Sequence, residues 1–187
     1  MRLGIVSDIH GQCDALEAAL TAMGPIDRLL CLGDSISQAS FSNETVALLR
    51  AQDPLIIIGN HEEAFFAGRG RHGARVDPAL AEWLATRPAQ LEAEIGGRRI
   101  LLAHSTPWGS DHEYVPPTHR DFGRFGEGDA HVVLYGHTHQ PVVRQIGQTL
   151  VVNPGSVGEG RPTDHGFVRS CALVDLETLA VEIIDLD

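Results

Sequence analysis

Three short apolar runs in the first third of the chain each stop abruptly at polar residues. The runs cover 3–6, 29–32 and 55–58, and the residues that stop them are Ser7-Asp8, Gly33-Asp34 and Gly59-Asn60-His61. Between the runs lie two segments, 14–23 and 42–49, in which apolar residues recur at helical spacing. Strands that are apolar on both faces and joined by helices are typical of a parallel sheet covered on both sides. The first third therefore predicts alternating strands and helices.

The remainder of the chain is richer in strand patterns. We expect a helix at 78–85 and strands at 132–135, 142–146, 150–152, 167–174 and 179–184, with two more strands around Gly96-Gly97 within 92–103. A tight turn at Gly147-Gln148 predicts a hairpin, whereas the Pro- and Gly-rich stretch 105–129 predicts an irregular excursion. Together these patterns predict an α/β fold with two packed mixed β-sheets flanked by helices, an αββα sandwich.

Length and composition favour one globular domain over residues 1–187. Hydrophobic residues make up 43% of the chain, and we see no internal repeat or low-complexity linker. The cysteines Cys13, Cys31 and Cys171 form no C-x-x-C pair, which predicts reduced thiols. The opening MRLGIVSD does not resemble a signal peptide, and no apolar run approaches the roughly 18 residues of a membrane span. We therefore expect a cytoplasmic protein that has no membrane partner.

The charged residues exclude several chemistries. All 14 basic residues are arginines, so a Schiff-base lysine, a pyridoxal-phosphate lysine and a P-loop lysine are impossible. The net charge of −11 also argues against stable non-specific binding to nucleic acid, because such binding rests on neutralising backbone phosphates.

Polar side chains gather where the apolar runs end. They are two aspartates, one asparagine and five histidines: Asp8, His10, Asp34, Asn60, His61, His104, His137 and His139. Ligand sites in open α/β sheets form beyond the carboxyl ends of the strands, where several loops converge. Any one of these residues is more often structural than functional, but the repeated position predicts that they share one site.

The donor types indicate which metals this site would bind. Oxygen and nitrogen donors without cysteine suit divalent Mn, Fe, Co, Ni or Zn better than Ca or Mg. One tetrahedral ion needs about four ligands, and the set contains nearly twice as many. Two ions that share a carboxylate would use the set fully, and ions about 3.5–4 Å apart can clamp both oxygens of an in-line displacement. The residues therefore favour phosphoryl transfer to water.

Six short motifs in a fixed order identify a family resemblance. They are SDIHG at 7–11, LGD at 32–34, GNHE at 59–62, AHS at 103–105, GHTH at 136–139 and NPGSVG at 153–158. This set resembles the motifs of the calcineurin-like metallophosphoesterase superfamily. The last motif is similar to the segment that follows GHTH in the short bacterial and archaeal phosphodiesterase-like branch of that superfamily. The resemblance spans residues 5–158, so it covers most of the chain.

The resemblance implies a role for each of these residues. Asp8, His10 and His139 would hold one ion, Asn60, His104 and His137 would hold the other, and Asp34 would bridge them. Two divalent ions would activate a hydroxide to attack phosphorus. We expect Mn first among the candidate metals, with Fe, Zn, Co and Ni as alternatives. His61 would stabilise the charge on phosphorus and protonate the leaving oxygen.

A departure from the family pattern narrows the subclass. Protein phosphatases and symmetrical dinucleoside tetraphosphatases carry G-D-x-x-D-R-G, whereas this chain has GDSISQAS and lacks that aspartate–arginine pair. We therefore expect hydrolysis of a small phosphodiester or nucleotide-like substrate. A phosphomonoesterase, a dinucleoside polyphosphate hydrolase and a non-catalytic protein-binding scaffold are the alternatives.

Two stretches offer substrate contacts. Arg69, Arg71 and Arg75 follow the GNHE motif and form either a phosphate clamp or a solvated loop. Trp108 and Tyr114 lie in the 105–129 excursion and either stack on a nucleobase or anchor the loop to the core. The sequence alone leaves the oligomeric state open.

Overall fold

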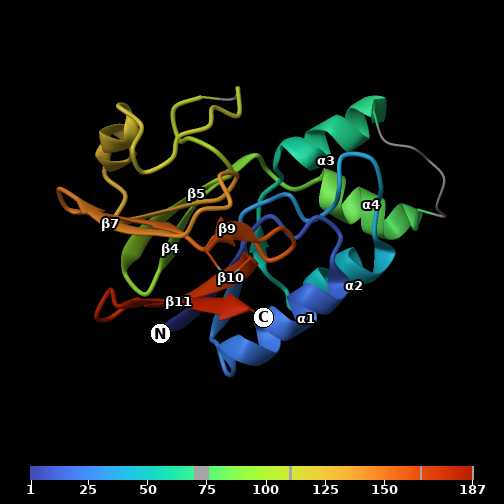
Figure 1. Cartoon of the computed structure of the whole chain (residues 1–187), viewed down its shortest axis with the longest axis horizontal. Helices are drawn as coiled ribbons and strands as arrows, with labels where there is room; N and C mark the ends of the chain where they lie inside the picture. Colours follow the sequence, from blue (N-terminus) through green and yellow to red (C-terminus); the bar gives the residue numbers. More distant parts are fainter. Residues whose placement is uncertain (70–75, 110, 165, 187) are drawn as a thin grey trace.

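Two mixed β-sheets pack face to face at the centre of the computed structural model, which describes residues 1–69, 76–109, 111–164 and 166–186 (Figure 1). The first sheet has the order β11 (Val181–Leu186), β10 (Gly166–Asp175), β1 (Arg2–Val6), β2 (Arg28–Cys31) and β3 (Leu55–Ile56), and β9 (Arg161–Thr163) pairs with β10. The second sheet has the order β4 (Gln90–Ile95), β5 (Arg98–Ala103), β6 (Val132–Tyr135), β8 (Thr149–Asn153) and β7 (Val142–Ile146). The predicted α/β architecture is confirmed.

Parallel pairing brings the carboxyl ends of several strands together. In the first sheet β1, β2 and β3 are parallel, and in the second β5, β6 and β8 are parallel. The remaining pairs are antiparallel, including the expected hairpin of β7 and β8 and the β4–β5 pair around Gly96-Gly97. The loops that leave the parallel strands are the ones that carry the polar motifs.

Three helices cover the outer face of the first sheet. They are α1 (Cys13–Met23), α2 (Asn43–Ala51) and α4 (Pro78–Ala85), close to the predicted positions. The helical spacing of α1 buries Leu16, Ala19 and Met23 in the same apolar cluster as Val6 and Cys31 of the sheet. Side-chain oxygens of Ser42 and Asp77 accept backbone N–H groups at the starts of α2 and α4.

Alternation along the strands divides the core of the molecule into layers. Leu30, Ile100, Leu102 and Leu134 point into the space between the two sheets and are fully or almost fully buried there. Val133 and Tyr135 on β6 point to the opposite face of the second sheet. Both faces of the central strands are therefore apolar, as the sequence predicts.

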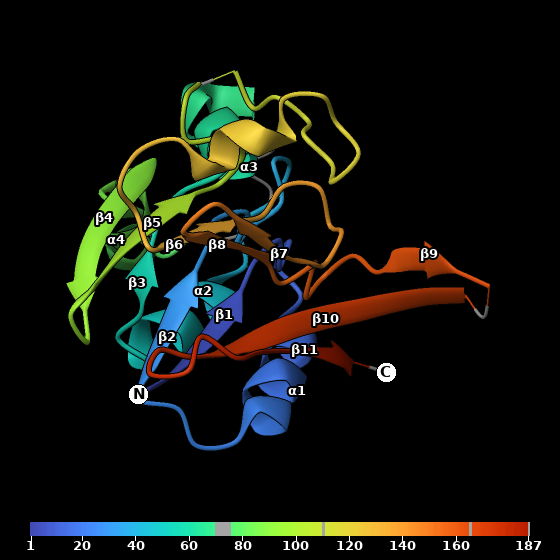
Figure 2. The same cartoon turned by 90° about the vertical axis from the view of Figure 1, so that its left-hand side faces the viewer.

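The irregular excursion covers the outer face of the second sheet. It contains a short 3-10 helix, η2 (Phe122–Gly126), whose Phe122 and Phe125 are buried against Tyr135 and Val151. Figures 1 and 2 show the excursion rising at the same end of the molecule as α3 (Asn60–Ala64). The flanking layer on this side is thus built mainly from irregular chain.

Several boundaries differ from the sequence prediction. The run 55–58 forms a strand only over Leu55–Ile56, since the N–H of Ile58 bonds to the Pro88 carbonyl instead of to β2. The short helix α3, the π-helical turn η1 (Phe65–Arg69) and strand β9 carry no periodic apolar signal, and the sequence did not predict them.

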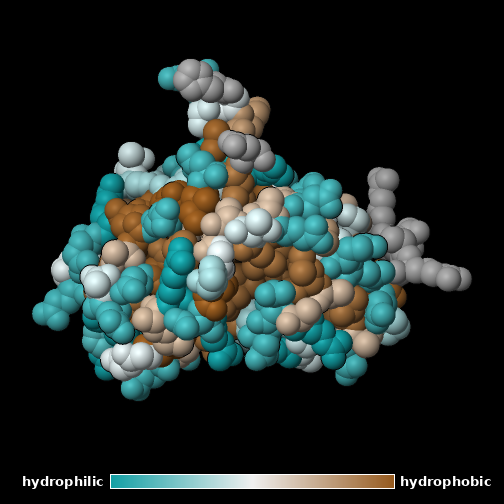
Figure 3. Space-filling model, turned by 90° about the horizontal axis from the view of Figure 1, so that it is seen from below, coloured by the Kyte–Doolittle hydropathy of each residue, from teal (hydrophilic) through white to brown (hydrophobic). Residues whose placement is uncertain are grey.

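The hairpin of β9 and β10 stands out from the body of the molecule (Figures 2 and 3). The face in Figure 3 otherwise mixes hydrophilic and hydrophobic residues. Among the described residues, no helix is long and apolar enough to cross a membrane.

Candidate metal centre

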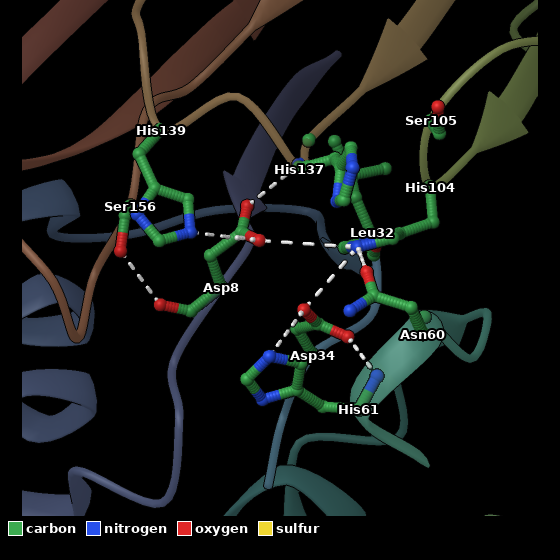
Figure 4. Close-up of polar contacts among 12 residues, drawn as sticks. Asp8, Leu32, Asp34, Asn60, His61, His104, Ser105, His137, His139 and Ser156 are labelled. Atoms are coloured by element: carbon green, nitrogen blue, oxygen red, sulfur yellow. Dashed lines mark hydrogen bonds and ion pairs between the residues drawn. The ribbon is translucent and has the colours of Figure 1, made fainter. Parts of the chain in front are cut away.

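The predicted polar residues converge at the carboxyl ends of the parallel strands (Figure 4). They come from the loops after β1, β2 and β3 in the first sheet and after β5 and β6 in the second: Asp8, His10, Asp34, Asn60, His61, His104, His137 and His139. Residues up to 131 positions apart in sequence therefore meet in one place, as Asp8 and His139 do (139 − 8).

One group of ligand-type atoms is formed by Asp8, His10 and His139. The Nε2 atoms of His10 and His139 lie 3.2 Å apart, and His139 Nε2 lies 3.4 Å from Asp8 Oδ1. These side chains present atoms within 4.8 Å of one another, which is close enough to share one ion.

A second group is formed by Asp34, His104 and His137, with Asn60 beside it. His104 Nε2 lies 3.3 Å from Asp34 Oδ2 and 3.1 Å from Asn60 Oδ1. Asp34 also belongs to a group with His10 and His61, so its carboxylate lies between the two sets. The family resemblance implies the same two sets, and their role in metal binding stays a prediction.

The local chemistry fits divalent cations. Asp8 Oδ1 is buried without a hydrogen-bond partner, which is costly for a carboxylate oxygen unless a cation faces it. His104 Nδ1 donates to the Leu32 carbonyl at 2.7 Å, so Nε2 is the ring nitrogen that faces the site. The oxygen and nitrogen donors suit metals of the Mn, Fe or Zn type, and the family implies divalent ions.

The electrostatics of the site also favour positive charge. Burial alone would raise the pKa of Asp8 and of Asp34, but hydrogen bonds and charges of nearby histidines lower both below the usual range. Burial alone would lower the pKa of His104, yet the negative charge of Asp34 raises it to about 10. In contrast, burial and the charge of His104 lower the pKa of His137 to about 4.

Five of the site residues adopt a backbone conformation that is rare outside glycine. Positive φ angles between 52° and 63° occur at Asp8, His10, Asp34, His137 and His139. Such left-handed residues cost about 1–3 kcal/mol each and persist only where the surroundings enforce them. Backbone strain is therefore concentrated at the residues that face the site.

Two glycines allow the loops to approach closely. A Cβ on Gly136 would collide with Ser7 Oγ and lie 2.8 Å from Asp8 Oδ2. A Cβ on Gly59 would collide with Asp34 Oδ1 and lie 2.8 Å from the His104 ring. Only glycine lets these backbones reach the carboxylates.

Several residues that sequence reasoning missed hold the ligand loops in place. The buried carboxylate of Glu62 accepts backbone N–H groups of Asp34, Ser35, Ile36 and Gly59 at 2.6–3.1 Å. Burial and the charge of Asp34 raise the pKa of Glu62 to about 7. Its position in the GNHE motif was the available signal.

The NPGSVG motif also holds the ligand loops in place through hydrogen bonds. Asn153 Nδ2 donates to the Gly136 carbonyl at 2.7 Å, and Ser156 Oγ donates to the Asp8 carbonyl at 2.7 Å. This loop therefore ties the β1 and β6 ends, and with them ligands of both groups, to the rest of the fold.

The segment GDSISQAS contacts the ring of His61. The backbone N–H of Gln38, within that segment, donates to His61 Nδ1 at 3.2 Å. His61 Nδ1 is thus an acceptor, and the proton of the neutral ring lies on Nε2, which is 3.8 Å from Asp34 Oδ2.

The predicted substrate contacts have different outcomes. Arg71 and Arg75 lie outside the described residues, and so does the side chain of Arg69. Trp108 packs edge-on against Phe125 with a centroid distance of 5.0 Å, as an anchor would. Tyr114 is 53% exposed and its ring lies 5.2 Å from that of His137.

A cavity of about 430 Å³ adjoins the second ligand group. Its lining includes Glu63, His104, Ser105, Trp108 and His112. The tryptophan thus contributes both to packing and to the wall of this cavity.

Comparison with known proteins identifies the family and fold relatives of this chain. The chain is 29% identical over 181 residues to phosphodiesterase YfcE of Escherichia coli, covering 92% of this chain and 90% of that one. It is 26% identical over 220 residues to an uncharacterized protein of Methanocaldococcus jannaschii, with coverage of 99% and 87%. A metallophosphoesterase from Sphaerobacter thermophilus shares the fold with a TM-score of 0.74 at 22% identity, covering 100% of this chain and 89% of that one. The family model described as the calcineurin-like phosphoesterase superfamily domain matches residues 1–179. This chain belongs to the calcineurin-like phosphoesterase superfamily.

Proposed function

We propose that this phosphoric ester hydrolase cleaves a small phosphodiester or nucleotide-like substrate with the help of two divalent ions, Mn²⁺ foremost. Asp8, His10 and His139 would hold one ion, and Asn60, His104 and His137 the other. Asp34 would contact both. The enzyme class follows from the family, and the similarity to phosphodiesterase YfcE favours a diester.

The observation that carries this proposal is the position of Asp34 between two ligand groups. Its carboxylate lies within 4.8 Å of donor atoms of His10 and His61 on one side and of His104 and His137 on the other. A carboxylate in this position can contact two cations, and a single ion would leave half of the surrounding donors without a partner. Bound divalent ions would supply an activated water and neutralise the charge of the phosphate.

The residues of the chain itself would orient the substrate and move a proton. His61 carries its proton on Nε2 because the Gln38 N–H occupies Nδ1. The backbone N–H of His61 donates to Asp34 Oδ1 at 2.9 Å, which fixes the ring next to the shared carboxylate. His61 would thus donate to a phosphoryl oxygen and protonate the leaving oxygen.

The surroundings also favour a small substrate. The cavity beside His104 holds about 430 Å³, which suits one organic group of a diester. The missing aspartate–arginine pair in GDSISQAS leaves no protein-phosphatase signature after β2. Arg69, Arg71 and Arg75 remain the predicted phosphate contacts.

Hydrolysis of bis-p-nitrophenyl phosphate and of p-nitrophenyl phosphate, each with Mn²⁺ and with other divalent ions, tests the proposal. We expect metal-dependent turnover of the diester to exceed that of the monoester. Preference for the monoester would overturn the diesterase assignment. Absence of turnover with either ester and every ion would favour the protein-binding scaffold. Activity on dinucleoside polyphosphates tests the remaining alternative.

A further inference from the structure

Three consecutive residues of the excursion, His112, Glu113 and Tyr114, are fastened to the loops of the metal centre. We call this segment the strap. The His112 carbonyl accepts a hydrogen bond from His137 Nε2 at 2.9 Å. The Glu113 carbonyl accepts one from the hydroxyl of Ser105, which directly follows His104. The strap therefore contacts one ligand of the second group and the neighbour of another.

Two side chains of the strap complete the attachment. The Tyr114 hydroxyl donates to the Thr138 carbonyl at 2.7 Å. His112 Nε2 lies 2.8 Å from Glu63 Oε2 on α3, the helix whose first residue is Asn60. The strap is thus joined to the loop or helix of each protein ligand in the second group apart from the shared Asp34.

The carbonyl contact determines which nitrogen His137 can offer. Because a carbonyl oxygen only accepts, the hydrogen must lie on His137 Nε2, and the lone pair of the neutral ring is on Nδ1. His112 adopts a left-handed backbone, with φ of 50°. Its side chain contacts Glu63 Oε2 at 2.8 Å, so this contact and the unusual backbone fix the carbonyl together.

Among the described residues, the strap approaches the first ligand group only through Thr138, which lies between His137 and His139 in sequence. Within the part of the chain that the structure describes, no hydrogen bond or ion pair joins residues 112–114 to Asp8, His10 or His139. The peptide that follows the strap enters the core at Val115, which is 1% exposed. The strap is therefore anchored at one end by apolar packing and at the other by Glu63.

We propose that the strap is a positioning element that orients His137 and sets the affinity of the second metal site. Glu63, His112 and Tyr114 are its positioning residues. This inference rests on the proposed two-metal function, because it assigns a specific device to one of the two sites. Groups that orient a metal-binding histidine typically change metal affinity by about 10–100-fold when removed.

Calorimetric titration of the metal-free protein with Mn²⁺ tests this inference without measuring activity. We expect the unaltered chain to bind two equivalents of Mn²⁺. Glu63→Ala and His112→Asn should each lower the affinity for one Mn²⁺ equivalent about tenfold or more and leave the affinity for the other unchanged. Asparagine tolerates the left-handed backbone of His112, so this variant removes the imidazole without adding backbone strain. The double variant should be no weaker than either single one, because both remove the same pair.

A matched control and a second readout separate positioning from general damage. Asp129→Ala removes an ion pair to Arg99 at 3.1 Å away from the site and should leave both equivalents unchanged. Nitrogen-15 spectra of the histidine rings should show His137 with its hydrogen on Nε2 in the unaltered chain and a mixture in the variants. Tyr114→Phe should weaken the same equivalent as Glu63→Ala.

The outcomes distinguish this inference from the proposed function. Unaltered protein that binds fewer than two equivalents would overturn the two-metal proposal and this inference with it. Two equivalents that respond equally to Glu63→Ala, or not at all, would overturn the strap alone. The same result follows if Asp129→Ala weakens one site as strongly as the strap variants do.

Discussion

The backbone N–H of Asp34 donates to the buried carboxylate of Glu62 at 2.9 Å, across 28 residues of sequence. Through this bond the carboxylate that lies between the two ligand groups is held by a residue that does not face the metals. The same Glu62 oxygen accepts the N–H of Gly59, so the loops after β2 and β3 share one anchor. The position of Asp34 is therefore determined by an interaction behind the site.

Glu62→Gln should destabilise the protein by about 1–3 kcal/mol, because an amide NH₂ would face two backbone N–H groups that now have an acceptor. Urea unfolding of the metal-free variant measures this change. Glu44→Gln, in the first turn of α2, is the control and should unfold like the unaltered chain. Equal stability of the two variants would contradict the anchoring role.

Asp34→Asn should reduce Mn²⁺ binding from two tight equivalents to one or fewer. An asparagine keeps the shape of the side chain but removes the negative charge that can attract two cations. Calorimetry gives the stoichiometry, and Asp129→Asn on the surface is the comparison. If the variant still bound two equivalents tightly, Asp34 would not be the shared ligand.

His61→Ala should keep both metal equivalents and lower kcat about 10²–10⁴-fold, as expected for loss of a proton donor. The diester assay and a metal titration on the same preparation separate the two effects. His131→Ala provides a histidine control, since His131 accepts the N–H of Arg99 away from the site. Unchanged turnover of His61→Ala would refute its catalytic role.

Gly136→Ala should weaken metal binding and destabilise the fold, because the new methyl group would collide with Ser7 and crowd Asp8. Gly123→Ala is the matched control, since nothing lies within 4 Å of a Cβ at that position. Thermal unfolding and Mn²⁺ titration should change for the first variant only. Similar behaviour of both variants would argue against the close approach at Gly136.

The stability of the protein should fall between about pH 8.5 and pH 12 through Cys31. Burial raises the pKa of this thiol to about 12, whereas an exposed thiol titrates near 8.5. Below pH 8.5 both states hold the proton. Above it the unfolded state loses its proton first, which costs the folded state about 2 kcal/mol at pH 10. Urea unfolding at pH 7.5 and 10 should show a smaller loss for Cys31→Val; equal losses would disprove the contribution of this thiol.

The sheet strands were largely predictable from the sequence, because burial on both faces requires continuous apolar runs and the chain has few alternatives for them. The helix α2 was predicted from its apolar spacing, and in the structure Ser42 caps it by accepting the N–H of Thr45. The short elements were not predicted. The helix α3 and the strand β9 form where tertiary contacts hold them, and their residues show no periodic pattern.

The site divides in the same way. The residue types and their places at strand ends, such as Asp8 and Asp34, follow from the sequence, because parallel strands bring their carboxyl ends to one edge. The roles of Glu62 and of the strap depend on contacts between residues tens of positions apart, as in the pair of Glu63 and His112, 49 residues apart. The sequence pattern shows which side chains are present and which face of a helix or strand they occupy. Only the packed structure decides which distant groups meet, because that depends on how the two sheets and the excursion fit together.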